Sequence, residues 1–394
     1  MTDTSGPNKE PPLEHWYSRE PFDPYSVEKF TPEQERFYMA SQWQMMWWKF
    51  RRHKIAVISG VILLLFYLSI LISEFLAPYD LQTRHTKYIF APPQSIHLFH
   101  EGEFVGPFVY GYKQRLNRET LKREYEVNIN KPYPLRFFCA GDEYEFWGMF
   151  KANLHLVCPD DKKLASFFWL GTDRLGRDIL SRIIYGARIS LSIGLIGIAI
   201  SFTLGIILGG ISGYYGGWID NVIQRTIELL KSLPQLPLWL ALSAALPVTW
   251  SPILVFFGLT VILGLLDWPG LARAVRSKFL SLREEDFCTA AQLMGAKPKR
   301  IIGRHLLPSF ASHLIASASL AIPSMILGET ALSFLGLGLR PPITSWGVLL
   351  NETTNINAVA TTPWLIYPVL PVIIVVLAFN FLGDGLRDAA DPYK

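Results

Sequence analysis

The stretch ISLSIGLIGIAISFTLGIILGGISGYYGGWI, residues 189–219, runs for 31 residues without a charged side chain. Three further windows of this kind cover residues 55–73, 232–266 and 353–383, with 19, 35 and 31 uncharged residues. A helix needs about 20 apolar residues to cross a hydrocarbon core ~30 Å thick. Of the 394 residues, 50% are hydrophobic and only 18% are charged. The sequence therefore predicts an all-α polytopic membrane protein and argues against a soluble enzyme.

We predict six membrane-spanning helices, five from these windows and one from the apolar run at 310–335. The longest window is too long for one helix, and Pro247 and Pro252, with Trp250 between them, are natural breakers. The predicted spans are Ile55–Leu76, Ile189–Tyr214, Val222–Leu246, Ile253–Trp268, Phe310–Leu335 and Trp364–Leu382.

The basic residues beside the spans indicate the orientation. Four of them, Lys49, Arg51, Arg52 and Lys54, directly precede the first span. Residues 270–309, between the fourth and fifth spans, hold eight basic and three acidic residues, a net charge of +5. Six spans place both segments on one side, which the positive-inside rule makes cytoplasmic. We therefore expect a multi-pass protein of the bacterial inner membrane with both termini in the cytoplasm.

This orientation divides the chain into five parts. Residues 1–54 form a cytoplasmic tail, 55–77 the first transmembrane helix and 78–186 an extracytoplasmic insert; 187–384 form a five-helix core that includes a cytoplasmic loop at 270–309, and 385–394 a cytoplasmic tail. The N-terminal tail ends in a predicted interfacial elbow helix. Its aromatic anchor is Trp43, Met46, Trp47 and Phe50, which share one helical face.

The insert is predicted to be a small folded unit. Residues 98–169 carry ten basic and ten acidic residues and 16 aromatic ones. A disordered segment typically lacks aromatic residues. We expect short strands around VGPFVYGY (105–112) and EYEVNI (124–129).

Two cysteines of the insert, Cys139 and Cys158, are candidates for a disulfide. An oxidising compartment permits such a bridge, and Cys288 lies alone in the cytoplasmic loop. Closing a loop of about 20 residues would stabilise the insert by roughly 3 kcal/mol. The alternative is two buried free thiols, because cysteine is among the more buried residue types.

The sequence shows no motif for covalent chemistry. It contains no G-x-x-x-x-G-K-[ST], no H-E-x-x-H and no G-x-S-x-G. We therefore expect no enzymatic activity and no cofactor or metal bound by this chain. The net charge of +4 gives no reason to expect a nucleic-acid partner.

The informative segment is EEDFCTAAQLMGAKPKRIIGRHLLPS, residues 284–309. Phe287, Ala290, Ala291 and Met294 fall on one face of a predicted helix, and Gly295 is placed as its C-terminal cap. This low, alanine-rich face suits a groove on another protein. A helix lying on the lipid surface would explain the periodicity equally well.

This loop resembles the cytoplasmic loop of permeases in ATP-binding-cassette importers. The resemblance rests on Ala290-Ala291, Gly295 and Leu307-Pro308; Thr289 stands where the family usually has Glu, and His305 where it often has Ile. Three longer stretches are similar to the C-type permease subunit of dipeptide, oligopeptide and nickel importers. They are LGTDRLGRDILSRIIYGARISLSIGL (170–195), ETALSFLGLGLRPPITSWG (329–347) and NFLGDGLRDAADP (380–392).

The resemblance implies a type I importer permease-like core that forms half of a pathway for peptides or similar small solutes. It also implies a second, homologous permease subunit in a heterodimer, two ATPase subunits that bind the ATP, and an extracytoplasmic solute-binding protein. The residues expected to couple to the ATPase are Asp286, Phe287, Thr289, Ala290, Ala291, Met294, Gly295, His305, Leu307 and Pro308.

One acid within a predicted span leaves an alternative open. Glu329 lies inside the fifth span without a local partner in the sequence, and a charge at bilayer depth normally faces a partner, a cavity or water. It is a candidate for the pathway or for a subunit contact. An ion-gradient-driven secondary transporter would use such an acid, although no internal repeat is visible.

Overall fold

The computed structural model describes residues 39–116, 118, 123–159, 166–247 and 249–390. The chain divides into residues 1–45 and residues 46–394, and the account below concerns the second part. Helix α2 (Gln42–Arg52) crosses this division and is helical over the stretch that the aromatic pattern predicted.

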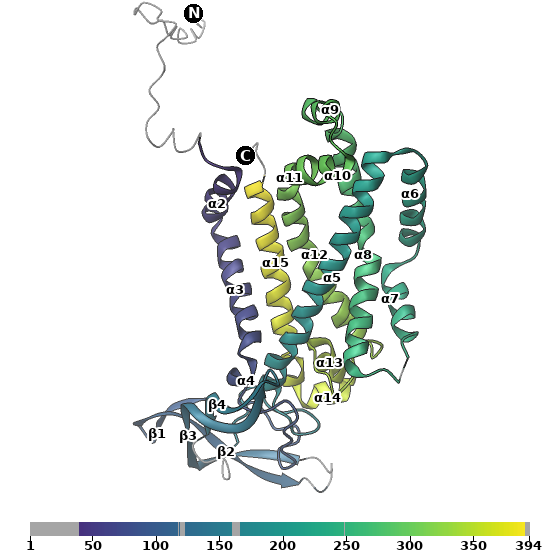
Figure 1. The fold of residues 1–394 in the computed structure, drawn as a ribbon. Coiled ribbons are helices and arrows are strands. Elements are labelled where there is room, and N and C mark those ends of the chain that lie inside the picture. The colour runs from purple at the N-terminus through teal and green to yellow at the C-terminus, as the bar shows by residue number, and fades with distance from the viewer. Residues whose placement is uncertain (1–38, 117, 119–122, 160–165, 248, 391–394) are drawn as a thin grey trace, which may run out of the picture. The chain divides into compact units, whose positions relative to one another are not determined.

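Five described segments are long and apolar enough to cross a membrane. They are α3 (Lys54–Leu71), α5 (Ile179–Tyr215), α8 (Pro252–Leu282), α12 (Ala311–Phe334) and the segment Pro363–Ala390, which contains α15 (Val369–Ala390). They lie side by side as a bundle, with α9 and α10 at one end and a β-sheet at the other (Figure 1). We call these the loop end and the insert end.

The predicted third span is not one helix. Residues 222–246 fall on α6 (Gly217–Ser232) and α7 (Gln235–Ala244), because Leu233 is extended and Pro234 follows it. On α6, Arg225 and Glu228 form an exposed ion pair with a distance of 2.7 Å. Among the described residues five helices qualify and α7 is a shorter apolar one, so the predicted count of six transmembrane helices is not confirmed.

Two spans are longer than the charge-free windows predicted. Helix α5 begins ten residues before Ile189, and α8 continues past Trp268, through Pro269, to Leu282. The charged residues in the extension of α5 are accommodated because they have partners: Arg182 lies 2.5 Å from Asp173, and Arg188 lies 2.8 Å from Glu74. Charge-free windows therefore miss the charged ends of these helices.

Helices α5 and α8 pack closely along small residues. A Cβ atom at Gly209 would lie 2.4 Å from the carbonyl oxygen of Ala272, and one at Gly213 would lie 2.8 Å from that of Arg276. Small residues allow helix backbones to approach each other closely inside a membrane. The α5–α8 pair is thus a tight unit within the bundle.

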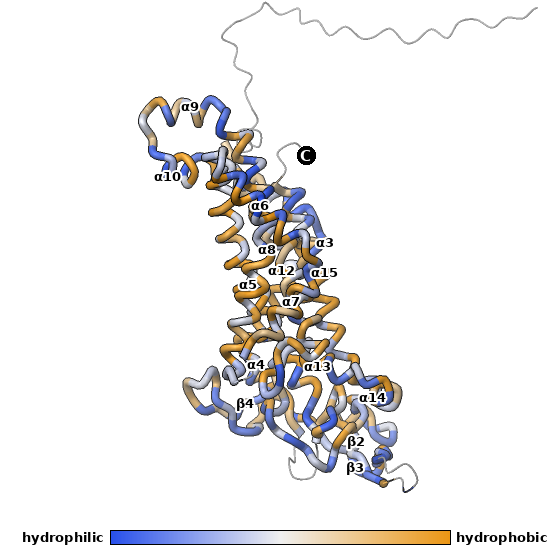
Figure 2. Tube along the Cα trace, turned by 90° about the vertical axis from the view of Figure 1, so that its right-hand side faces the viewer, coloured by the Kyte–Doolittle hydropathy of each residue, from blue (hydrophilic) through white to orange (hydrophobic). Residues whose placement is uncertain are grey.

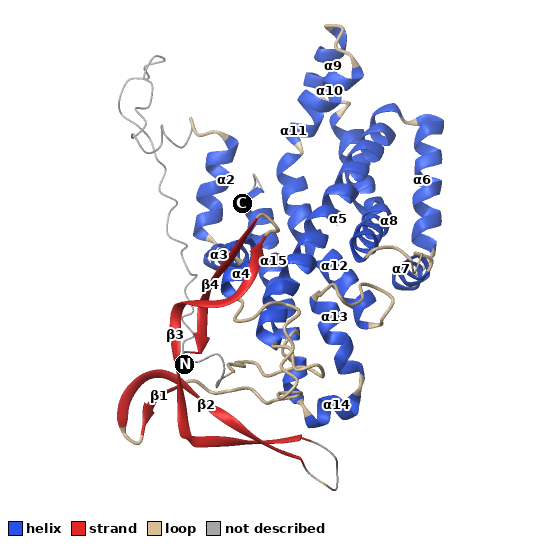
Figure 3. Ribbon diagram, turned by 60° about the horizontal axis from the view of Figure 1, so that its bottom comes forward, coloured by secondary structure: helices blue, strands red, loops and turns tan. Residues whose placement is uncertain are grey.

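The insert between α3 and α5 contains the four strands of an antiparallel sheet (Figure 3). After α4 (Ser73–Leu76) come β1 (His97–His100), β2 (Glu103–Leu116), β3 (Arg123–Phe146) and β4 (Phe150–Pro159), paired in that order. Both predicted strands are present, but β2 and β3 have 14 and 24 residues and are not short. Strand β3 is long because its first half pairs with β2 and its second half with β4. The all-α prediction therefore holds for the bundle and not for the insert.

Short helical elements complete both ends of the bundle. At the loop end these are α9 (Asp286–Leu293), α10 (Pro298–Ile301), a π-helical turn (Ile302–Leu306) and α11 (Leu307–Ser309). Between α12 and α15 lie α13 (Trp346–Asn351), a 3-10 turn (Glu352–Thr354), α14 (Ile356–Thr361) and a second 3-10 turn (Pro363–Ile366). The elements of both groups are short, and each group connects two longer helices.

Candidate functional site

Local sequence explains why α9 forms and where it ends. Asp286 lies in its first turn, where the helix dipole favours an anion. At the other end, the amide of Gly295 donates to the carbonyl of Gln292 at 2.9 Å, and that of Ala296 to Ala291 at 3.0 Å. This double hydrogen bond is the Schellman arrangement, which needs a left-handed residue, and Gly295 has φ +78°. Gly295 thus occupies the capping position that the sequence indicated.

One face of α9 is buried within the loop itself. Cys288 is 0% and Ala291 3% exposed. They share a core with Val275 and Phe279 of α8, Ile301, Leu306, and Phe310 and Leu314 at the start of α12. Ala291 therefore packs inside the loop and is not available on the face that we expected to meet a partner. Burial also raises the pKa of the Cys288 thiol.

The opposite face of α9 exposes apolar side chains. Leu293 and Met294 are 84% and 82% exposed, Phe287 is 42% exposed, and Ala290 is exposed as well. We call these four residues the apolar face of α9. Leu293 was not among the predicted coupling residues, yet it lies on this exposed face, whereas the predicted residue Ala291 does not.

The other predicted coupling residues lie around this face and behind it. Asp286 and Thr289 are exposed, and the Thr289 hydroxyl donates back to the Glu285 carbonyl at 3.4 Å. Leu307 packs against the same core as Ala291, His305 is half-buried and Pro308 is exposed. The π-helical turn directly precedes Leu307 and Pro308, and proline cannot donate the backbone hydrogen bond of a regular helix. The structure thus brings both motifs, 286–295 and 305–308, into one compact loop.

The core of the loop fastens it to α8 and α12, and two polar contacts join the helices beside it. The Arg276 guanidinium makes two hydrogen bonds of 2.5 Å to the Asp220 carboxylate, which joins α8 to α6. Hydrogen bonding by Arg276 lowers the pKa of Asp220. Arg283 donates to the carbonyl of Tyr214 at the end of α5, at 3.3 Å. Sequence reasoning missed the Asp220–Arg276 pair, because 56 residues separate its members.

Glu329 has partners, contrary to the expectation from sequence. Its side chain is fully buried and accepts hydrogen bonds from the hydroxyls of Ser190, Ser333 and Ser345, at 3.3, 2.8 and 2.6 Å. These residues come from α5, α12 and the N-cap of α13, so the carboxyl group joins three elements near the insert end. In this conformation Glu329 is enclosed by protein. Only Ser333 is near it in sequence, which is why the sequence gave no signal.

A cluster of buried charges lies where the insert meets α5. Asp173 accepts from Arg177 at 2.7 Å and from Arg182 at 2.5 Å, and Arg182 also lies 3.0 Å from Glu352. Burial raises the pKa of Asp178 to about 7. Asp178 caps α5 by accepting from the amide and the hydroxyl of Ser181, both at 2.7 Å. The cluster fixes the start of α5 to the segment after α13.

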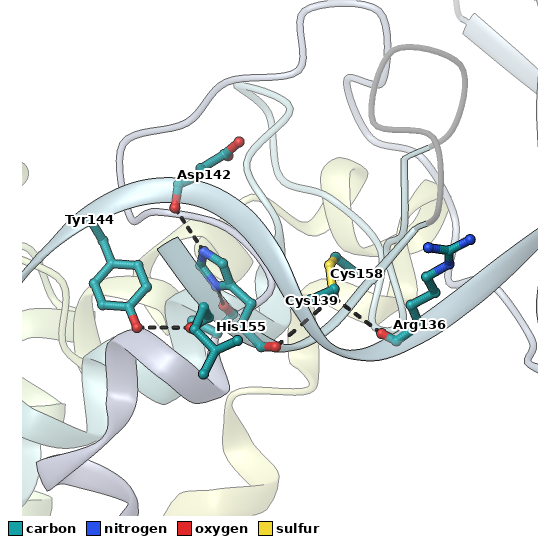
Figure 4. The surroundings of a disulfide bond; sticks show 8 residues. Arg136, Cys139, Asp142, Tyr144, His155 and Cys158 are labelled. Atoms are coloured by element: carbon teal, nitrogen blue, oxygen red, sulfur yellow. Dashed lines mark hydrogen bonds between the residues drawn. A yellow bond between two sulfur atoms is a disulfide. The ribbon is translucent and has the colours of Figure 1, made fainter. Parts of the chain in front are cut away.

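Cys139 and Cys158 are joined by a disulfide that links β3 to β4, with Cα atoms 6.2 Å apart (Figure 4). Beside it, the imidazole of His155 is fully buried. Its two nitrogens lie 2.6 Å from the Ala77 carbonyl and 3.0 Å from the Asp142 carbonyl. The half of the sheet that carries the disulfide is therefore tied to the end of α4. Oxidation of the pair in the cell stays a prediction.

No group of three or more His, Cys, Asp or Glu side chains in the described residues could hold a metal ion.

Comparison with known proteins identifies the family. A model described as "Binding-protein-dependent transport system inner membrane component" matches residues 202–393, and "N-terminal TM domain of oligopeptide transport permease C" matches 41–93. The dipeptide transport system permease protein DppC of Alkalihalophilus pseudofirmus is 40% identical over 57% of this chain and 71% of its own length. The chain belongs to the family of C-type permeases of ATP-binding-cassette peptide importers.

Other relatives are similar to the same extent. The oligopeptide transport system permease protein OppC of Haemophilus influenzae is 40% identical over 58% of this chain and 71% of its own length. The glutathione transport system permease protein GsiD of Pectobacterium atrosepticum is 40% identical over 58% of this chain and 73% of its own length. Among solved structures, the inward-facing MetNI methionine ABC transporter covers 54% of this chain and 98% of its own, with a TM-score of 0.43 and 19% identity. As a C-type permease, the chain is a multi-pass protein of the bacterial inner membrane.

Proposed function

We propose that this permease imports peptides or similar small solutes as one half of a translocation pathway, driven by ATP on separate subunits. The observation that carries the proposal is the apolar face of α9, exposed on a loop whose core continues into α8 and α12. A second, homologous permease would supply the other half of the pathway, and an extracytoplasmic binding protein would deliver the solute. Cargo identity would depend mainly on that binding protein.

The coupling follows from how the loop is packed. Protein interiors are close-packed and transmit displacement between neighbouring elements. A push on α9 therefore moves Cys288 and Ala291 against Phe279 of α8 and Phe310 before α12. ATP binding on the partner would thus shift an equilibrium between inward-open and outward-open arrangements of the bundle. Such a shift needs no catalytic residue in this chain, which acts as a permease and not as an enzyme.

The docking face can be tested separately from the loop core. We expect Leu293→Asp to lower ATP-dependent uptake at least ~10-fold, because one uncompensated charge at a desolvated contact costs more than about 1.4 kcal/mol. Ala291→Arg should instead destabilise the loop, since Ala291 is 3% exposed. Uptake and ATP hydrolysis would be measured in proteoliposomes that hold the complete importer.

Gln292→Asp is the matched control. It places the same charge on the same helix at an exposed residue outside the apolar face. Uptake by this variant should remain near the level of the unchanged protein. If Leu293→Asp and Gln292→Asp transported equally well, the assignment of the apolar face as the ATPase contact would be wrong.

Six crossings and a cytoplasmic loop form the second part of the proposal. In Figure 1, α6 and α7 follow each other beside α8 from the loop end to the insert end, which supports a broken sixth crossing. The net charge of +5 over residues 270–309 favours a cytoplasmic loop end, and the insert is then extracytoplasmic. Both termini would share the cytoplasm with the loop.

Labelling of introduced cysteines tests this orientation. From outside intact inner membranes, an impermeant maleimide should react with a cysteine at Val105 in the insert and not with one at Lys297 in the loop. Both positions are exposed, so burial does not limit either reaction. The reverse pattern would overturn the orientation while leaving the family assignment intact.

The alternative, an ion-gradient-driven secondary transporter, finds no support. None of the relatives named above is described as one. The one acid that fitted it, Glu329, is enclosed and satisfied by three serine hydroxyls. Uptake that continued in proteoliposomes without the ATPase subunits would revive this alternative.

A further inference from the structure

The hairpin that joins β3 to β4 presents large apolar side chains. Phe138 is 67%, Trp147 44%, Met149 72% and Phe150 57% exposed. We call these four residues the hairpin patch. Trp147 and Phe138 have positive φ values of 51° and 52°, a conformation that is unfavourable for bulky side chains. Exposed apolar groups of this size call for a partner surface.

The patch is fastened to the end of α3. The Trp147 indole donates to the Leu71 carbonyl at 3.0 Å, and the ring of Phe138 lies 6.0 Å from that of Phe75. The guanidinium of Arg188, from α5, lies 3.9 Å from the centre of the Trp147 ring. Arg188 is itself held by Glu74 at 2.8 Å. These contacts fix the level of the hairpin relative to the membrane-spanning helices.

That level corresponds to the edge of the hydrocarbon core. The 18 residues of α3 span about 27 Å at 1.5 Å per residue, close to the ~30 Å of a bilayer core. Leu71, at the end of α3, therefore lies at the boundary. The exposed side of α3 carries Leu64, Leu68 and Leu71. The carbonyl of Leu71 accepts the hydrogen bond from the Trp147 indole. Figure 2 shows the hairpin beside β4 projecting sideways beneath the helices, at the level of α4.

We propose that the β3–β4 hairpin is an interfacial membrane anchor, whose patch enters the headgroup boundary of the bilayer next to α3. Tryptophan is the side chain most suited to this depth, because its ring is apolar and its N–H finds a partner. Glu145 and Lys151, paired one step behind the closing Phe146–Phe150 pair, provide a polar rim. A lipid surface is favoured over a protein partner because the patch continues the apolar flank of a membrane span.

Photocrosslinking in nanodiscs tests the anchor. The full chain would carry p-benzoylphenylalanine in place of Met149, in discs of phosphatidylethanolamine and phosphatidylglycerol, and mass spectrometry would detect lipid adducts. Ile129 is the matched control, because it lies on the part of β3 that pairs with β2 and is 62% exposed. In Figure 2 the β2–β3 end of the sheet lies on the other side of the bundle. Leu68 of α3 provides a lipid-exposed reference.

We expect lipid adducts at Met149 to exceed those at Ile129 roughly tenfold or more, because an interfacial side chain is buried several ångströms into the bilayer boundary. Equal yields at both positions, with Leu68 labelled normally, would overturn the proposal. Adducts from Met149 to protein alone would also overturn it and would reveal a protein partner instead. The same photocrosslinker in place of Phe150 provides a second measurement of lipid adducts from the hairpin patch. The result does not depend on transport or cargo, so it is separate from the proposed function.

Discussion

At the loop end of the bundle, Phe279, Leu306 and Phe310 are buried together in an apolar core, whereas at the insert end Asp173 and Arg182 are buried as ions. The two ends therefore differ in what they bury, although the partly exposed Asp220–Arg276 pair also joins helices at the loop end. Apolar packing is non-directional, so the loop end can adjust while it stays packed. A buried, hydrogen-bonded ion pair tolerates little change in geometry, because an unpaired buried charge is costly.

This difference suits the proposed roles of the two ends. The loop end must follow a partner and must pass the displacement on to α8 and α12. The insert end must keep α5, the segment after α13 and the sheet in a fixed arrangement. We infer that motion begins at the apolar end and that the charged end acts as the fixed point.

The largest expected effect comes from removing one ion at the insert end. Arg182→Met leaves Arg177 as the one arginine that pairs with both Asp173 and Glu352. One negative charge of the buried cluster is then uncompensated, which should lower the free energy of unfolding by about 3–5 kcal/mol. Arg283→Met at the loop end is the matched control, because its ion-pair partner Glu284 is exposed and its other contact is one hydrogen bond to the Tyr214 carbonyl, which together contribute only about 1–2 kcal/mol. Denaturant unfolding in mixed micelles would measure both. Equal losses would remove the distinction between the ends.

The disulfide should stabilise the insert end alone. Replacing Cys139 and Cys158 by serine removes a bridge across 19 residues, which is worth roughly 3 kcal/mol. Hydrogen exchange should rise in β3 and β4 and stay unchanged around the buried Cys288 of the loop end. Mass spectrometry of a non-reduced digest checks the bridge directly. Both peptides found separate and alkylatable without reductant would show that the pair is reduced.

The last expected effect is a pH dependence of opposite sign at the two ends. Burial raises the pKa of Asp178 from 3.8 to about 7, so its contribution to stability is full below pH 3.8 and is lost as the pH rises towards 7. The pKa of Asp220 is lowered by Arg276, so its contribution is present above 3.8 and is lost as the pH falls below that value.

Hydrogen exchange at a series of pH values, corrected for intrinsic rates, would measure this contrast. Asp178→Asn should flatten the dependence at the start of α5 while it keeps the helix cap, because asparagine also caps helices well. The exchange of α6 should be unaffected by this variant. If the stability of both ends changed with pH in the same direction, the opposite roles given to Asp178 and Asp220 would be wrong.

The sequence alone identified the features that depend on neighbouring residues. Charge-free windows located four of the five long helices, because the free energy of transfer into lipid sums over a local stretch; the fifth, α12, was predicted from an apolar run that contains Glu329. The aromatic content of the insert predicted a folded unit with strands at 105–112 and 124–129, which lie in β2 and β3, and Gly295 marked the end of α9. The break at Pro234 also had a local signal, the proline itself, and the prediction of one continuous third span overlooked it.

Only the tertiary structure decided which groups meet across the chain. Ser190 reaches Glu329 over 139 positions and Arg182 reaches Glu352 over 170, and no local pattern encodes such pairs. The same holds for Ala291, which the helical period placed on a docking face and the loop core buries. A period shows which residues share a face of a helix. What that face packs against is decided by elements distant in sequence, because burial depends on the packed whole.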